Sequence, residues 1–214
     1  DIFFYSLTQT LKQNLFSNIH MIYNSIIDNI LTSSRHNITQ TTRIDPNTGI
    51  DYIYSNDISN LTTDNIFKKK RVVLFSLPGA FTPTCSTHQL PGFDQNFETF
   101  KKEGIDEIFV VSVNDAFVMQ AWFAQQNIKH IKSIADGNGD FTRKLGLLVR
   151  KENINFGMRS WRYSMLVEDG EIQVAFIEDG FQDDADGDPF EKSDVDTMKT
   201  WLTQMHGEPE DTQE

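Results

Sequence analysis

The residue of this sequence best placed to do chemistry is its single cysteine, Cys85. It follows the apolar run 72–77, which predicts a strand buried on both faces, and then a turn rich in glycine and proline. Beyond the turn, apolar residues begin to recur at helical spacing from Leu90. We therefore expect Cys85 near the first turn of a helix, where free backbone N–H groups and the helix dipole favour an anion.

A cysteine in such a place can ionise to a reactive thiolate. Thr82, three residues earlier, can turn its hydroxyl toward the sulfur or toward an oxygen bound to it. The competing interpretation is a small buried hydrophobic residue, which is the common fate of a lone cysteine. The strand–turn–helix setting, with Thr82 and two flanking prolines, favours the reactive interpretation.

Residues 78–86, Pro-Gly-Ala-Phe-Thr-Pro-Thr-Cys-Ser, resemble the peroxidatic-cysteine motif of the peroxiredoxins, in the form used by the type-five group. Three later blocks, 111–119, 135–142 and 159–165, resemble that group in the same order. The resemblance extends from about residue 42 to residue 202. In particular, these blocks resemble the peroxiredoxin half of bacterial hybrids that carry a glutaredoxin domain. The resemblance implies an α/β, thioredoxin-like fold, with a mixed central sheet and helices on both faces.

Carried over position by position, the resemblance implies a catalytic set of Pro78, Thr82, Cys85 and Arg162. The thiolate would attack one peroxide oxygen and release the other, so fixed donors are needed where charge develops. Arg162 would supply the cation, the Thr82 hydroxyl and the turn N–H groups would supply hydrogen bonds, and Pro78 would shield the thiolate from water. Arg159 is the neighbouring candidate for this arginine. It ranks second because its position relative to the following strand does not match the position of the family's arginine.

The loop around Phe81 and Gly79 is expected to contact the substrate. In the family, this loop and the region around 114–119 lie near the dimer contact and the mouth of the site. The resemblance therefore implies a homodimer, with an apolar rim that admits hydrogen peroxide and small alkyl hydroperoxides.

The cysteine count determines the rest of the cycle. Attack would leave a sulfenic acid, and no second cysteine in the sequence could resolve it. A one-cysteine cycle regenerated from outside is therefore expected, with glutathione and glutaredoxin as reductant or, next, thioredoxin. No C-x-x-C pair occurs, so we expect the glutaredoxin domain to be absent. Two alternatives remain: a peroxide sensor or redox relay that uses the same cysteine, and a non-catalytic binding protein of thioredoxin-like fold.

One position departs from the family pattern. Many relatives place a histidine four residues after the cysteine, where this sequence has Gln89, and the histidine here is His88. A shift of one residue turns a helical side chain by about 100°. We therefore expect His88 at the surface and outside the site.

Composition agrees with a soluble, cytoplasmic protein, and we expect neither a cofactor nor a metal. The 214 residues carry a net charge of −12, which argues against nucleic acid or an anionic membrane as partner. A lone cysteine suits a reducing compartment. The acidic run 183–188 has carboxylates at alternate positions but lacks the rest of an EF-hand loop, so we expect a solvated loop there.

Periodicity and turn residues predict the elements. We expect strands at 72–77, 108–113, 131–135, 163–169 and 171–178, and helices at 84–102 (bent at Pro91), 115–126, 140–145 and 193–205 (capped by Ser193). We expect an N-terminal extension over 1–40, whose apolar spacing is compatible with a helix, and an added hairpin or loop over 42–60. The peroxiredoxin domain is expected over 41–205, and an acidic, disordered tail over 206–214.

Overall fold

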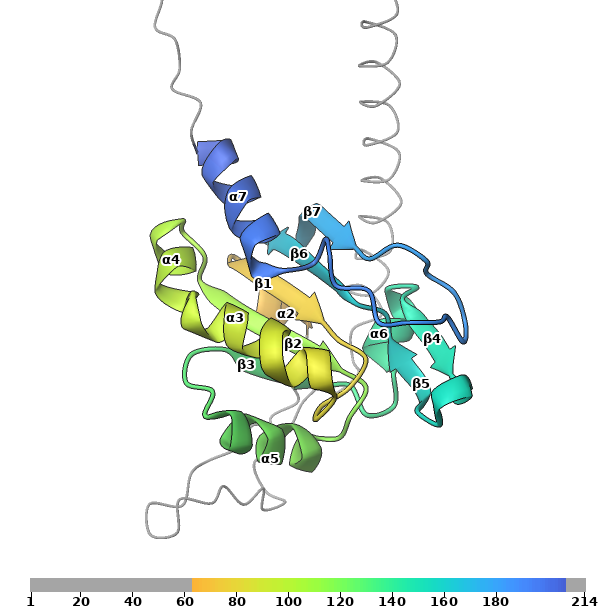
Figure 1. Ribbon diagram of the computed structural model, residues 1–214. Helices are drawn as coiled ribbons and strands as arrows, with labels where there is room; N and C mark the ends of the chain where they lie inside the picture. The colour runs from red at the N-terminus through yellow and green to blue at the C-terminus, as the bar shows by residue number, and fades with distance from the viewer. Residues whose placement is uncertain (1–62, 207–214) are drawn as a thin grey trace, which may run out of the picture.

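The computed structural model describes residues 63–206 (Figure 1). The predictions for 1–40, for 42–60 and for the tail beyond residue 206 lie outside this part of the chain. The centre of the fold is a five-stranded sheet with the order β3-β2-β1-β6-β7. Its strands are β1 (Arg71–Ser76), β2 (Glu107–Ser112), β3 (Lys132–Ala135), β6 (Tyr163–Glu168) and β7 (Glu171–Ile177).

The sheet is mixed, as predicted. Strand β1 pairs in parallel with β2 on one side and antiparallel with β6 on the other. Five of the six residues of β1 are buried, which is why this strand is apolar throughout. Because β6 runs back along β1, the end of β1 lies beside the start of β6, and Ser76 pairs with Tyr163.

Helices cover both faces of the sheet and enclose two cores. Alternate residues of β1 point to opposite faces, so Val72 and Leu74 enter one core while Val73 and Phe75 enter the other. The first core is closed by α2 (Thr63–Phe67) and α6 (Asp140–Lys144). The second is closed by α3 (Leu90–Gln95), α4 (Phe97–Lys102), α5 (Ala116–Gln126) and α7 (Val195–His206).

The segment predicted as one helix over 84–102 is divided into three pieces. A π-helical turn, η1 (Cys85–Gln89), leads into α3, and α3 ends at Asn96, where α4 begins. The bend expected at Pro91 lies instead at Asn96, whose side-chain amide donates to the carbonyl of Gly92 at 2.8 Å. Pro91 lies in the first turn of α3, where a missing N–H costs little.

A hairpin between α6 and β6 was not predicted. Strands β4 (Leu148–Lys151) and β5 (Gly157–Ser160) pair antiparallel around the short 3₁₀ helix η2 (Glu152–Ile154). Only four residues long and exposed in alternation, these strands give a weak sequence signal. The hairpin matters for the site because it carries Arg159.

The cap predicted for the last helix is one residue too early. The carboxylate of Asp194 accepts from the backbone N–H groups of Asp196 at 2.8 Å and Thr197 at 2.9 Å, so Asp194 caps α7. The Ser193 hydroxyl donates instead to Glu178, at 2.7 Å. Among residues 63–206, no helix is both long and apolar enough to cross a membrane.

Candidate active site

The structure places Cys85 at the start of a helical segment, as the sequence predicted. Strand β1 ends at Ser76, a loop follows, and Cys85 is the first residue of η1. Its side chain is completely buried and belongs to the second core, together with Leu77 and Leu90. The sulfur is therefore not exposed to solvent in this structure.

Arg162 reaches this sulfur from the neighbouring strand. It lies immediately before β6, opposite the point where β1 runs into the loop. Its Nη1 atom is 3.5 Å from the Sγ atom of Cys85, and the residue is only 1% exposed. The structure thus places a buried cation in direct contact with the sulfur.

Two further side chains hold the Arg162 guanidinium. Nη1 also donates to the Oε1 atom of Gln89, and Nη2 forms an ion pair with the carboxylate of Asp188. Gln89 is itself fixed, because its Nε2 donates to the backbone carbonyl of Ser76 at 3.2 Å. The arginine is thus held between η1 and the long loop that precedes α7.

Sequence reasoning missed the roles of both residues. The expectation that His88 faces outward is confirmed, since it is exposed while Gln89 is buried. Gln89 lies one helical turn beyond Cys85, and that spacing was the available signal. Asp188 had no comparable signal, because it lies 26 residues from Arg162 along the chain.

The acidic run 183–188 is therefore not simply a solvated loop. Asp184 accepts from the backbone N–H groups of Glu152 at 2.7 Å and Asn153 at 3.1 Å, and from Arg150 at 2.9 Å. The bond from Asn153 is the main reason why the pKa of Asp184 lies below its ordinary value. These bonds join the loop to the β4–β5 hairpin. Within 63–206, no group of His, Cys, Asp or Glu side chains could hold a metal ion.

Glu178, at the start of the same loop, ties it to the residues at the end of the loop, just before α7. Its carboxylate accepts from the backbone N–H groups of Glu191, Lys192 and Ser193 and from the Ser193 hydroxyl, at 2.7–3.1 Å. Burial alone would raise the pKa of Glu178, but these hydrogen bonds outweigh it, and the pKa lies below its ordinary value.

Thr82 lies in the loop before Cys85, but its hydroxyl does not point a proton at the sulfur. It donates to the carbonyl of Gly79 at 2.9 Å, while the Thr82 carbonyl accepts from the N–H of Ser86 at 3.0 Å. In this arrangement the hydroxyl proton is used within the loop. Its oxygen remains an acceptor. Pro78, at the start of the loop, is half-buried.

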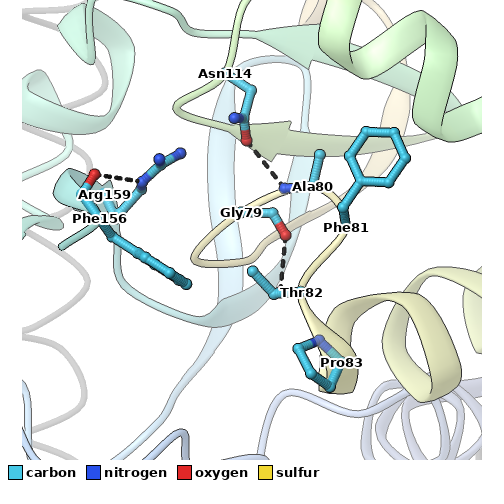
Figure 2. A pocket seen from close by; sticks show the side chains of 8 residues that line it. All are labelled: Gly79, Ala80, Phe81, Thr82, Pro83, Asn114, Phe156 and Arg159. Atoms are coloured by element: carbon cyan, nitrogen blue, oxygen red, sulfur yellow. Dashed lines mark hydrogen bonds between the residues drawn. The ribbon is translucent and has the colours of Figure 1, made fainter. Parts of the chain in front are cut away.

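A pocket of about 330 Å³ lies against this loop (Figure 2). It is lined by residues 79–83, which include the expected substrate contacts Gly79 and Phe81, and by Asn114, Phe156 and Arg159. Cys85 and Arg162 do not line it. The pocket thus adjoins the loop that leads to Cys85 but does not include the sulfur.

Arg159 belongs to this pocket and not to the sulfur. Its Nε donates to the carbonyl of Phe156 at 3.0 Å, and its Nη1 donates to that of Val113 at 2.9 Å. Burial lowers the pKa of this guanidinium below its ordinary value. The structure thus places Arg162, and not Arg159, beside the cysteine.

A buried cysteine at the start of a helix, with a guanidinium on its sulfur and a mixed sheet behind it, defines a thiol-based redox protein of thioredoxin-like fold. Comparison with known proteins agrees: the Redoxin family model matches residues 41–197. Peroxiredoxin sll1621 of Synechocystis is 58% identical over 141 residues, which are 66% of this chain and 75% of the relative. The chain belongs to the peroxiredoxins of the redoxin family.

Other relatives support the same assignment. The hybrid peroxiredoxin hyPrx5 of Haemophilus influenzae is 51% identical over 147 residues, covering 69% of this chain and 59% of the hybrid. Among solved structures, the antioxidant protein of Plasmodium falciparum, a 1-Cys peroxiredoxin, is 39% identical with a TM-score of 0.66, and the match covers 67% of this chain and 84% of that one. Reduced Prx3 of Vibrio vulnificus with hydrogen peroxide is 35% identical with a TM-score of 0.62, over 78% and 93% of the chains.

The protein is thus a thiol-dependent peroxidase, whose substrate is a peroxide and whose reductant is a thiol. The sequence holds one cysteine, which is consistent with a one-cysteine cycle.

Proposed function

We propose that Cys85 is the peroxide-attacking residue and that Arg162 stabilises both the thiolate and the leaving oxygen. The observation that carries this assignment is the 3.5 Å distance from Nη1 of Arg162 to Sγ of Cys85 in a site closed to water. The thiolate attacks the terminal peroxide oxygen, so an S–O bond forms as the O–O bond breaks. Sulfur is oxidised to sulfenic acid, and the second oxygen leaves as hydroxide or alkoxide and takes up a proton.

The preceding loop supplies the remaining groups. With its proton given to Gly79, the Thr82 oxygen can accept the hydrogen of the terminal peroxide oxygen and orient it toward the sulfur. We assign to Pro78 the role of shielding the thiolate from water. Gly79 and Phe81, which line the adjoining pocket, are assigned to substrate contact.

The reductant is proposed to be glutathione acting with glutaredoxin, with thioredoxin as the second candidate. The sulfenic acid condenses with one thiol to a mixed disulfide and water, and a second thiol releases reduced Cys85. The 51% identity to a hybrid peroxiredoxin supports this choice, because the sequence resembles hybrids that carry a glutaredoxin domain.

A homodimer and a cytoplasmic location remain predictions. The dimer is supported by the exposure of two large apolar side chains, Phe81 at 50% and Phe117 at 61%. A partner subunit could cover these two side chains. We also propose that they form an apolar rim around the site, which would accept small alkyl hydroperoxides as well as hydrogen peroxide. Sedimentation of the wild type and of Phe117→Glu tests the dimer, and a wild-type monomer at micromolar concentration would contradict it.

The test of the peroxidase assignment is stopped-flow reaction of the reduced protein with hydrogen peroxide, followed by mass analysis of Cys85. We expect a fast stoichiometric reaction that gives a sulfenic adduct and that is absent in Cys85→Ser. A rate no higher than that of a free thiol would overturn it. Turnover is then compared with glutathione plus glutaredoxin and with thioredoxin; fast oxidation without turnover by either would favour the sensor or relay.

A further inference from the structure

Arg159 is an unusual cation in this fold, because no carboxylate among residues 63–206 lies within ion-pair distance of it. Each of the other four arginines in this part of the chain has such a partner: Arg71 pairs with Glu168, Arg143 with Asp140, Arg150 with Asp184 and Arg162 with Asp188. Arg159 is nevertheless half-buried, and its loss of solvent lowers its pKa. A desolvated guanidinium without a counter-charge is disfavoured, so a ligand that supplies the negative charge would be bound firmly.

The guanidinium is held in position and still has free donors. Two of its five N–H groups are used by the carbonyls of Phe156 and Val113, which anchor it between the β4–β5 hairpin and the end of β2. The remaining donors suit the planar, two-oxygen geometry of a carboxylate. Figure 2 shows Arg159 and Phe156 on one side of the pocket, facing Gly79 and Thr82 on the other.

The pocket is close to the reacting sulfur without including it. A Cβ placed on Gly79 would lie 3.4 Å from the Thr82 methyl and 3.6 Å from Nη1 of Arg159, so the guanidinium packs against the loop that leads to Cys85. Thr82 is one turn before the cysteine, as the bond from the Ser86 N–H to its carbonyl shows. A molecule of tripeptide length, about 10 Å when extended, could therefore hold a carboxylate at Arg159 and carry its reacting group to the loop.

We propose that this pocket is a carboxylate subsite, in which Arg159 binds a carboxylate of the small thiol that reduces oxidised Cys85. The thiol is a better occupant than hydrogen peroxide because it is larger and can carry a carboxylate for Arg159, which hydrogen peroxide lacks. The thiolate then attacks the sulfenic sulfur, the S–S bond forms as the S–O bond breaks, and hydroxide leaves and takes up a proton as water. The assignment of the ligand as the reductant rests on the proposed function. Binding of a carboxylate at Arg159 does not depend on it.

Binding is tested first, on the reduced full-length chain, with the unreactive probe S-methylglutathione and its dimethyl ester followed by calorimetry. We expect the acid to bind about tenfold more tightly than the ester to the wild type. Arg159→Gln should lose this preference, and Arg159→Lys should keep part of it because the charge remains. The matched control is Arg143→Gln, which removes an exposed arginine elsewhere and should bind like the wild type. Equal binding of acid and ester to the wild type would overturn the proposal.

Kinetics then separate the thiol from other sources of a carboxylate. Cys85 is oxidised with one equivalent of hydrogen peroxide, and its reduction is timed with glutathione and with neutral dithiothreitol. In Arg159→Gln the ratio of the glutathione rate to the dithiothreitol rate should fall about tenfold. If Arg159→Gln slowed reduction equally with both thiols, or also slowed the reaction with hydrogen peroxide, Arg159 would only support the loop. Either result would overturn the assignment.

A third arm replaces hydrogen peroxide by a hydroperoxide that carries a carboxylate and by its methyl ester. If Arg159→Gln changed only the preference for this acid and left the thiol ratio intact, the subsite would serve the oxidant, and its assignment to the reductant would be overturned. Failure of the peroxidase assignment would appear separately, as a slow hydrogen peroxide step in the wild type while probe binding persists.

Discussion

Arg162 holds its Nη1 atom 3.5 Å from the sulfur of Cys85, although 77 residues separate the two in the chain. The antiparallel pairing of β1 with β6 creates this contact, because it sets Ser76 opposite Tyr163. The cysteine follows the end of one strand and the arginine precedes the start of the other. The two residues therefore meet at the same end of the paired strands β1 and β6, which are inner strands of the sheet.

Arg162→Met should slow the reaction of Cys85 with hydrogen peroxide by about a hundredfold or more, the cost typical of losing one preorganised donor at a developing charge. Methionine fills a similar volume, so the buried space is not left empty. Stopped-flow rates under pseudo-first-order conditions measure the effect. Arg143→Gln is the control, and equal rates for Arg162→Met and the wild type would contradict the role assigned to this arginine.

Gln89→Ala should destabilise the protein by about 1–3 kcal/mol, because it leaves a buried guanidinium N–H and the Ser76 carbonyl without this partner. The neighbouring change His88→Ala, at an exposed position, should alter stability by less than about 0.5 kcal/mol. Urea unfolding of the two variants makes the comparison. Equal stabilities would mean that Gln89 does not anchor the arginine.

Asp188→Asn should slow the peroxide step roughly three- to tenfold, because Arg162 loses the charged acceptor that holds its Nη2 atom. The Asp188 side chain is 41% exposed, so the effect should be smaller than that of Arg162→Met. Asp186→Asn, in the same loop, removes the same charge and should react like the wild type. A faster reaction in Asp188→Asn would show that Asp188 competes with the thiolate for the cation.

The stability of the loop before α7 should depend on pH through Glu178. Its folded pKa lies below the ordinary value of 4.5, so the carboxylate stabilises the fold above that pH and loses this contribution as the pH falls through the folded pKa. Glu178→Gln should cost about 1–3 kcal/mol at pH 7, since backbone N–H groups lose a charged acceptor. The difference from wild type, measured by urea unfolding at pH 7 and at pH 3, should shrink in acid.

Asp136 should show the opposite sign. Burial raises its pKa above 3.8 despite the N–H groups of Phe141 and Thr142 that donate to it. Its protonation therefore favours the folded state, and stability should fall as the pH rises from 3.8 through the folded pKa. Asp136→Asn should remove this part of the pH dependence in urea titrations. An unchanged pH profile would contradict the direction of this shift.

The strands of the central sheet were predictable because their signals are local. Strand β1 is a continuous apolar run, and Asp169-Gly170 marks the turn of the β6–β7 hairpin. Helix α5 (Ala116–Gln126) begins within one residue of the helix predicted over 115–126, and Asp115 caps it. The β4–β5 hairpin escaped prediction because its short strands are fixed by contacts with the distant Asp183 and Asp184.

The sequence by itself indicated the nucleophile and its setting, because the single cysteine follows an apolar strand and a Gly/Pro turn and precedes apolar residues at helical spacing. The resemblance of its sequence blocks to a known family implied that Thr82 and Arg162 belong with it. Only the tertiary structure decided which acceptors hold the arginine, that the Thr82 proton goes to Gly79, and that Arg159 lines a separate pocket. These outcomes depend on contacts between segments that fold together from far apart, and such contacts leave no periodic trace in the chain.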